Sequence, residues 1–186
     1  PGLVVLSPYD SADAKGMLKA AINSPNPVIF LENEILYNES FEVPDGDYII
    51  PIGKASIKKS GKDITLVSFS RGVHTSLEAS KILSKHNINA EVIDLRSLRP
   101  IDFETIINSV KKTNNIITVE EGWLSSGLGA EIISRVSSEA FNYLDAPPLR
   151  IGALDVPLPY AKNLEEQSIP TAKRVAKECL YHLQNN

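Results

Sequence analysis

The chain has 186 residues, a formal net charge of −4 and 42% hydrophobic residues, enough for a buried core and too many for extensive disorder. The acidic balance and the missing basic stripe argue against a nucleic-acid partner. No apolar run reaches the roughly 20 residues of a membrane span. The single cysteine, Cys179, excludes an internal disulfide and a cysteine-based zinc site, and favours a reducing compartment.

The first 37 residues are predicted to form a strand, a helix and a second strand. Leu3–Leu6 is a short apolar run typical of a buried strand, and Val28–Leu31 is another. Between them, apolar residues from Ala14 to Ile22 recur at helical spacing. The prolines in Ser24–Pro27 end that helix.

The hydrophobic periodicity is lost after this unit, because prolines and glycines interrupt it. Residues 41–57 are predicted to hold only short extended or hairpin pieces. We therefore interpret this stretch as a linker and place a domain boundary between Asn33 and Gly61.

The second domain reads as four strand–helix units. The strands are predicted at Ile64–Val67, Glu91–Leu95, Ile116–Val119 and Leu149–Ile151, each followed by a segment of helical periodicity. This alternation predicts a doubly wound α/β fold, with a mostly parallel sheet covered on both faces. The last helix is expected to begin at Ser168 as N-cap, with Pro170 in its first turn.

Three segments at predicted strand ends have unusual compositions. In Glu120–Gly129, two carboxylates precede a Gly/Ser loop that opens a helix, where backbone N–H groups can hold an anion. The favoured alternative is a helix entry that needs small residues for close packing. Within it Trp123 is either a core plug or an interface anchor.

The other two segments offer less chemistry. Arg96 and Arg99 can bind a phosphate or carboxylate, but pairing with nearby acids such as Asp94 and Asp102 is the favoured interpretation. The loop Ala153–Tyr160 is typical of a packing or contact loop. The three histidines, His74, His86 and His182, do not cluster. The residues alone thus indicate an α/β module that binds or assembles, without a complete catalytic set.

Seven stretches together carry a resemblance to a known family. They are Asp13–Ile22, Pro27–Glu34, Ile50–Ala55, Leu98–Pro100, Val119–Trp123, Phe141–Pro147 and Asp155–Ala161. In this order they resemble the beta subunits of the pyruvate dehydrogenase E1 component. Residues 62–186 resemble their transketolase C-terminal domain, and residues 1–37 resemble the last strand–helix–strand of a truncated pyrimidine-binding domain.

The resemblance implies a C-terminal portion of an enzyme subunit. The whole enzyme would decarboxylate pyruvate oxidatively on thiamine diphosphate with Mg²⁺, and would transfer the acetyl group to lipoyl-E2. The principal cofactor ligands and the catalytic residues would lie outside this chain. The implied partners are an E1 alpha subunit, a second E1 beta subunit in an α2β2 heterotetramer, and the E2 acetyltransferase. The implied compartment is bacterial cytoplasm or mitochondrial matrix.

The resemblance also implies two local sites. A potassium ion would be held largely by backbone carbonyls of Ala21, Ile22, Ser24 and Asn26, although Ser24 stands where the family commonly has Asp. A plain helix end is the alternative. Asp145 would contact E2, or would merely cap a turn. For the whole chain, the alternative function is a non-catalytic scaffold or binding module.

Overall fold

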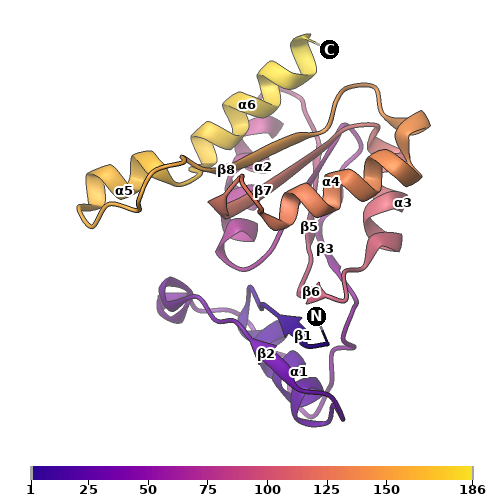
Figure 1. Cartoon of the computed structure of the whole chain (residues 1–186), viewed down its shortest axis with the longest axis vertical. Helices are drawn as coiled ribbons and strands as arrows, with labels where there is room; N and C mark the ends of the chain where they lie inside the picture. Colours follow the sequence, from indigo (N-terminus) through magenta and orange to yellow (C-terminus); the bar gives the residue numbers. More distant parts are fainter. Residues whose placement is uncertain (1, 186) are drawn as a thin grey trace.

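The computed structural model describes residues 2–185 and contains two sheets stacked end to end (Figure 1). The smaller one has the order β2-β1-β6. Its strands are β1 (Val4–Leu6), β2 (Val28–Phe30) and β6 (Ser97–Arg99), and helix α1 (Ser11–Ile22) connects the first two. β1 and β2 are parallel, as expected of the predicted strand–helix–strand unit. β6, which the sequence did not predict, pairs antiparallel with β1 and ties the unit to the second domain.

Helix α1 is set by its own end residues. Asp10 has an extended backbone, and its carboxylate accepts a hydrogen bond from the backbone N–H of Asp13 at 2.7 Å, which is an N-cap. The helix packs closely on the following segment, since a Cβ at Gly16 would lie 2.7 Å from Cγ1 of Ile50. The long connection after β2, which includes the 3₁₀ helix η1 (Glu34–Asn38), therefore folds back over α1.

The larger sheet has the order β3-β5-β4-β7-β8. Its strands are β3 (Ser56–Lys59), β4 (Ile64–Ser68), β5 (Ala90–Asp94), β7 (Ile116–Trp123) and β8 (Leu149–Ala153). The last four are parallel, and β3 pairs antiparallel with β5 at one edge. The sheet thus confirms the predicted mostly parallel α/β fold, and part of the segment expected to be a linker supplies its edge strand.

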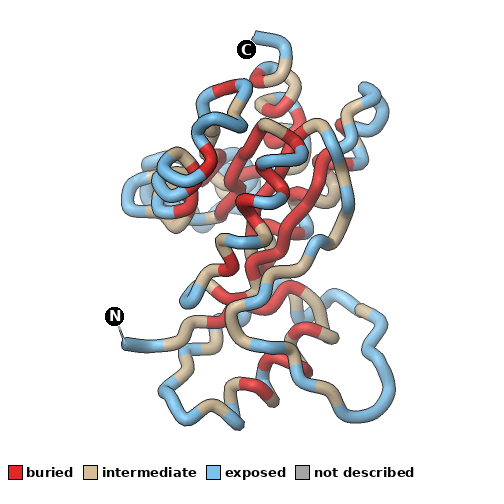
Figure 2. Tube along the Cα trace, turned by 90° about the vertical axis from the view of Figure 1, so that its right-hand side faces the viewer, coloured by how far each residue is buried: buried red, intermediate tan, exposed pale blue. Residues whose placement is uncertain are grey.

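Helices cover both faces of this sheet: α2 (Arg71–Ser84) and α6 (Ala172–Asn185) on one, α3 (Phe103–Thr113) and α4 (Leu128–Glu139) on the other. The 3₁₀ helix η2 (Phe141–Tyr143) follows α4, and the short helix α5 (Lys162–Ser168) precedes α6. Neighbouring residues of β4 face opposite ways: Leu66 packs in the cluster with α2 and α6, and Val67 packs in the cluster with α3 and α4. This alternation buries the strands on both sides, as the buried segments in Figure 2 show.

The start of the last helix differs from the prediction. Ser168 ends the short helix α5, and its hydroxyl donates to the carbonyl of Leu164 at 2.8 Å. Ile169 is extended because Pro170 follows it and disfavours a helical backbone. Helix α6 begins two residues after Pro170, where the Thr171 hydroxyl accepts from the N–H of Arg174. The cap is therefore Thr171.

Candidate functional site at the seam between the two sheets

A first cavity, of about 240 Å³, lies over the loop after β1 and helix η1 and is lined by residues from 8 to 41. A second cavity, of about 210 Å³, lies at the seam where the sheets meet, among residues that follow β1, β2 and β4 and residues near the end of β7. The second is lined by Ser7, Leu31, Glu32, Asn33, Phe69, Ser70, Glu121 and Gly122. Ligands of open α/β sheets bind at the carboxyl ends of strands, so this seam is the candidate site.

Glu121 bridges the two halves of the molecule at this cavity. Its Oε2 accepts a hydrogen bond from Nδ2 of Asn33 at 3.1 Å, and its Oε1 lies 3.1 Å from Nη1 of Arg71. Burial raises the pKa of Glu121, and the charge of Arg71 and the bond from Asn33 oppose that rise. A carboxyl group in this setting can exchange a proton closer to neutral pH than an exposed one.

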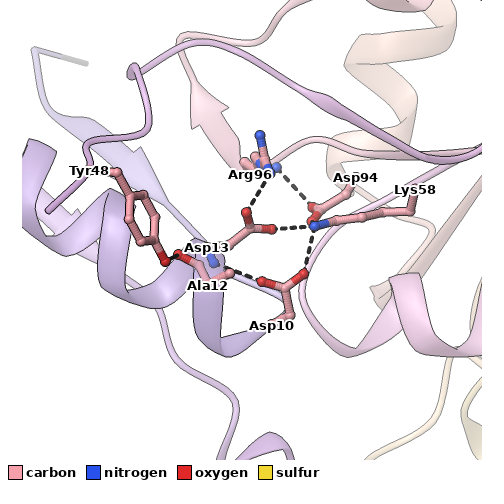
Figure 3. A network of polar contacts seen from close by, with 7 residues as sticks. All are labelled: Asp10, Ala12, Asp13, Tyr48, Lys58, Asp94 and Arg96. Atoms are coloured by element: carbon pink, nitrogen blue, oxygen red, sulfur yellow. Dashed lines mark hydrogen bonds and ion pairs between the residues drawn. The ribbon is translucent and has the colours of Figure 1, made fainter. Parts of the chain in front are cut away.

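A second polar cluster joins α1 to the larger sheet (Figure 3). Nζ of Lys58, on β3, lies 2.6 Å from Oδ2 of Asp13, 2.7 Å from Oδ2 of Asp10 and 3.7 Å from Oδ2 of Asp94. Nη2 of Arg96 lies 2.5 Å from Oδ1 of Asp13. Asp13 and Asp94 are almost completely buried. Three carboxyl groups therefore share two cations in a site largely closed to water.

The cluster has one more carboxyl group than it has cations, and this excess favours a proton on one of the three carboxyl groups. Burial raises the pKa of Asp94 to about 8, against the opposing charge of Lys58. Burial also disfavours the charge of Lys58, but its hydrogen bonds to Asp10 and Asp13 outweigh that effect and raise the pKa of Lys58. A proton on Asp94 leaves two carboxylates facing two cations, so the neutral pairing is the favoured state.

The predicted arginine segment takes part in this cluster through a partner that the sequence did not indicate. Arg96 was expected to pair with an acid nearby in sequence, but its guanidinium reaches Asp13, and only its backbone N–H donates to Asp94, at 3.0 Å. Asp102 instead caps α3, accepting from the N–H of Thr105 at 3.2 Å. Arg99 is exposed.

The Gly/Ser loop before α4 holds the protein's own anion. The Glu120 carboxylate accepts hydrogen bonds from the N–H groups of Leu128 at 3.0 Å and Gly129 at 3.1 Å. Burial raises the pKa of Glu120, and these two bonds oppose the rise. A Cβ at Gly129 would lie 2.4 Å from Oγ1 of Thr118. Close packing by small residues, the favoured interpretation, is thus confirmed.

Trp123, the last residue of β7, lies at the surface against a projecting arm and not in the core. Its side chain is half exposed, and Nε1 donates to the carbonyl of Val156 at 3.0 Å. The arm, residues 154–168, leads through α5 and extends away from the body (Figure 1). Large apolar residues are exposed along it: Leu154, Val156, Leu158, Tyr160 and Leu164. Such an apolar segment is typical of a contact surface, as the sequence predicted for residues 153–160.

The residues expected to hold potassium lie at the exposed end of α1. The carbonyl of Ala21 accepts from the N–H groups of Asn23 and Ser24, and the N–H of Asn26 donates to Oγ of Ser24 at 3.2 Å. Ala21 and Ser24 are half-buried, and Ile22 is exposed. Two of the four residues, Ala21 and Ile22, are the last residues of α1, and Ser24 and Asn26 follow it directly.

Asp145 is exposed in the loop after η2. The loop is held by its backbone, since the N–H of Asp145 donates to the carbonyl of Asn114 at 2.9 Å and Nδ2 of Asn114 donates to the carbonyl of Tyr143 at 2.6 Å. The carboxylate takes part in none of the hydrogen bonds found for the described residues. His74 and His86 are exposed, and His182 is buried.

Among residues 2–185, no group of three or more His, Cys, Asp or Glu side chains is arranged to hold a metal ion. Within the same range, no helix has the length and apolarity that crossing a membrane would require.

These features define the class: a doubly wound α/β domain whose carboxyl edge is closed by a second, smaller sheet. The family model of the transketolase C-terminal domain matches residues 53–175. The chain therefore belongs to the transketolase C-terminal domain family.

The similarity to individual curated proteins is more specific than the family match. The chain is 56% identical over 94% of its length to the "Pyruvate dehydrogenase E1 component subunit beta" of Rhizobium meliloti, covering 38% of that protein. It is 50% identical over its whole length to the mitochondrial subunit of the same name from Dictyostelium discoideum, covering 53%. The Caenorhabditis elegans mitochondrial subunit is 54% identical over 95% of the chain, which covers 52% of that protein. The chain thus spans about half or less of these relatives.

Solved structures confirm the fold. A chain described as "Split gene transketolase, inactive beta4 tetramer" superposes with a TM-score of 0.80 at 28% identity, covering 99% of this chain and 58% of the other. A transketolase mutant from Pichia stipitis superposes with a TM-score of 0.62 at 16% identity, covering 99% of this chain and 25% of that one. The second likeness concerns the fold alone.

Proposed function

We propose that this chain is the C-terminal part of the beta subunit of a pyruvate dehydrogenase E1 enzyme, which decarboxylates pyruvate oxidatively and transfers the acetyl group to lipoyl-E2. The observation that carries the proposal is 50–56% identity to such subunits over nearly the whole chain. The division into a pyrimidine-binding-domain remnant at 1–37, a linker at 38–61 and a complete domain at 62–186 belongs to the same proposal.

The cofactor of the whole enzyme would be thiamine diphosphate with Mg²⁺. The cofactor supplies the carbanion chemistry, while the protein supplies position and electrostatics. We place its principal ligands outside residues 1–186. Two buried carboxylates of this chain are engaged by the protein itself: Glu120 by the start of α4, and Asp13 by Lys58 and Arg96.

This part of the subunit would serve assembly into an α2β2 heterotetramer with the E1 alpha subunit. The arm at 154–168 supports that role because its apolar residues are exposed to solvent in the isolated chain. A structural relative is described as a β4 tetramer. The relatives come from a bacterium and from mitochondria, which fits either bacterial cytoplasm or mitochondrial matrix as the compartment.

Asp145 would contact the binding domain of E2. The backbone bonds that fix its loop leave the carboxylate exposed, so a basic partner can reach it without reordering the loop. The exposed carboxylate favours docking over a role as a turn cap.

Potassium would bind at the end of α1, with carbonyl oxygens of Ala21, Ile22, Ser24 and Asn26 as ligands. Hard cations prefer oxygen donors, and carbonyl groups at a helix end carry the negative end of its dipole. A rubidium- or thallium-soaked crystal of the chain should show an anomalous peak within bonding distance of these carbonyls. A map without a peak there would reject the site.

The proposed function is tested by exchange. Residues 1–186 replace the matching half of the Caenorhabditis elegans beta subunit, and the chimera is expressed with its alpha subunit. We expect a heterotetramer that turns over pyruvate with thiamine diphosphate and Mg²⁺. A chimera that folds, judged by its circular dichroism, but does not bind the alpha subunit would favour the alternative, a non-catalytic scaffold or binding module.

A further inference from the structure

The order of strands identifies one edge of the larger sheet as a binding position. The chain runs from β4 outward to β5, then crosses back to place β7 on the other side of β4. Strand order thus reverses between β4 and β7. In doubly wound sheets the crevice at such a switch point, outside the carboxyl ends, is where ligands bind. The 210 Å³ cavity is lined there by Ser70, after β4, and by Glu121 near the end of β7.

Ser70 has an unusual backbone at this position. Its φ of 49° and ψ of −137° lie outside the regions that residues with a side chain prefer. Small neighbours fix the turn: Oγ of Ser68 donates to the carbonyl of Val119 at 2.7 Å, and a Cβ at Gly72 would lie 2.3 Å from that same Oγ. A sharp turn from strand to helix with a central serine presents that hydroxyl at the edge of the sheet.

The Ser70 hydroxyl is available at the start of a long helix. Only 9% of Ser70 is exposed, yet its hydroxyl takes part in no hydrogen bond among the described residues, although it lines the cavity. Asp10 and Asp102 cap α1 and α3 with their carboxylates, and Glu120 serves α4 in the same way. At the start of the 14-residue α2, the corresponding side chain makes no hydrogen bond to a helix amide, and its residue lines the cavity.

We propose that this turn binds a small oxyanion, a carboxylate or a phosphate group, through the Ser70 hydroxyl and the amino end of α2. Helix amino ends favour anions because their first N–H groups lack intrahelical partners and carry the positive end of the dipole. The size of the cavity fits a small acid and is too small for a nucleotide.

The charged groups around Glu121 give the site a pH dependence. Glu121 faces Arg71 on α2, Asn33 after β2 and, at longer range, Glu165 on α5, while Glu32 lines the same cavity. An ionised Glu121 repels an anion and holds Arg71. A protonated Glu121 does neither, so Arg71 becomes free to pair with the ligand. Anion binding therefore strengthens as the pH falls, the direction that the raised pKa of Glu121 supports.

The test is a titration of the full 186-residue chain, labelled with ¹⁵N, with inorganic phosphate and separately with acetate at constant ionic strength. We expect saturating shifts of the Ser70 and Arg71 amide signals with at least one of these anions, and tighter binding at pH 5.5 than at pH 7.5. The two arms decide between phosphate and carboxylate. Shifts that do not saturate, or that spread over surface lysines instead, would overturn the proposal.

Variants separate the site from the surface. Ser70→Ala should weaken binding about tenfold, the cost of one hydrogen bond to a charged group. Glu121→Gln should strengthen it and remove its pH dependence. Ser138→Ala, an exposed serine on α4, is the matched control and should change nothing. If Ser70→Ala perturbs the fold, Ser70→Gly removes the hydroxyl with a residue that tolerates the same backbone. Unchanged affinity in the folded serine variant would refute the site.

Discussion

Replacing Asp94 by Asn should change how the stability of the protein depends on pH. Asp94 is fully buried, its Oδ2 has no hydrogen-bond partner among the described residues, and Lys58 Nζ is 3.7 Å away. Its pKa is about 8 in the folded chain and about 3.9 in an unfolded one. Between these values the folded protein holds one proton that the unfolded chain has released.

The difference in bound protons sets the direction in which the free energy of unfolding changes with pH. Because the unfolded chain binds fewer protons, the Asp94 contribution to the free energy of unfolding decreases as pH rises from about 4 to about 8. One proton sets a limit of about 1.4 kcal/mol per pH unit, or about 4 kcal/mol between pH 5 and pH 8. Asn mimics the protonated acid, so the variant should differ little from the original chain at pH 5 and become relatively more stable at pH 8.

The measurement is urea unfolding of both proteins at pH 5, 6.5 and 8 and constant ionic strength. Other buried groups also have shifted pKa values: burial raises those of Glu120 and Glu121 and lowers that of His182. The difference between the two proteins cancels these contributions. The exposed Asp45→Asn is the matched control and should run parallel to the original. If the free energy of unfolding of Asp94→Asn also changes with pH in parallel with that of the original chain, then Asp94 is ionised in the folded protein and its pKa is not raised.

Three further outcomes are expected. Gly129→Ala should destabilise the chain by about 1–3 kcal/mol in urea unfolding, because its Cβ would meet Thr118 and Glu120, whereas Ser134→Ala on the exposed face of α4 should have little effect. Asp145→Asn should weaken binding of the E2 binding domain by about 1 kcal/mol or more and reduce its salt dependence in calorimetry; equal affinity at low salt would make Asp145 a loop residue only. The purified chain with thiamine diphosphate and Mg²⁺ should not decarboxylate pyruvate, and measurable turnover without an alpha subunit would contradict the proposed placement of the catalytic residues.

Local patterns in the sequence determined the elements of this protein. The runs at Ile64–Val67 and Ile116–Val119 are apolar at every or nearly every position, and strands of that kind need cover on both faces. Prolines and caps fixed where α1 stops and where α3 starts, because these signals act over three or four residues. The seven stretches that resemble the pyruvate dehydrogenase E1 beta subunits identified the family, because they are also local sequence patterns.

Contacts between distant residues were decided by the tertiary structure alone. β6 follows β5 by only a few residues, yet it joins the other sheet, because the chain turns at Arg96, where φ is 58°, and finds the free edge of β1.

The seam shows the same limit for function. Asp13 reads as an ordinary first-turn acid, and Ser70 as an ordinary N-cap, in any local window. Only the fold brings Lys58 and Arg96 to Asp13, and only the fold places Ser70 in the lining of a cavity shared with Glu121. Periodicity records which face of an element is buried, but the partner of a buried charge is set by how elements dozens of residues apart pack against each other.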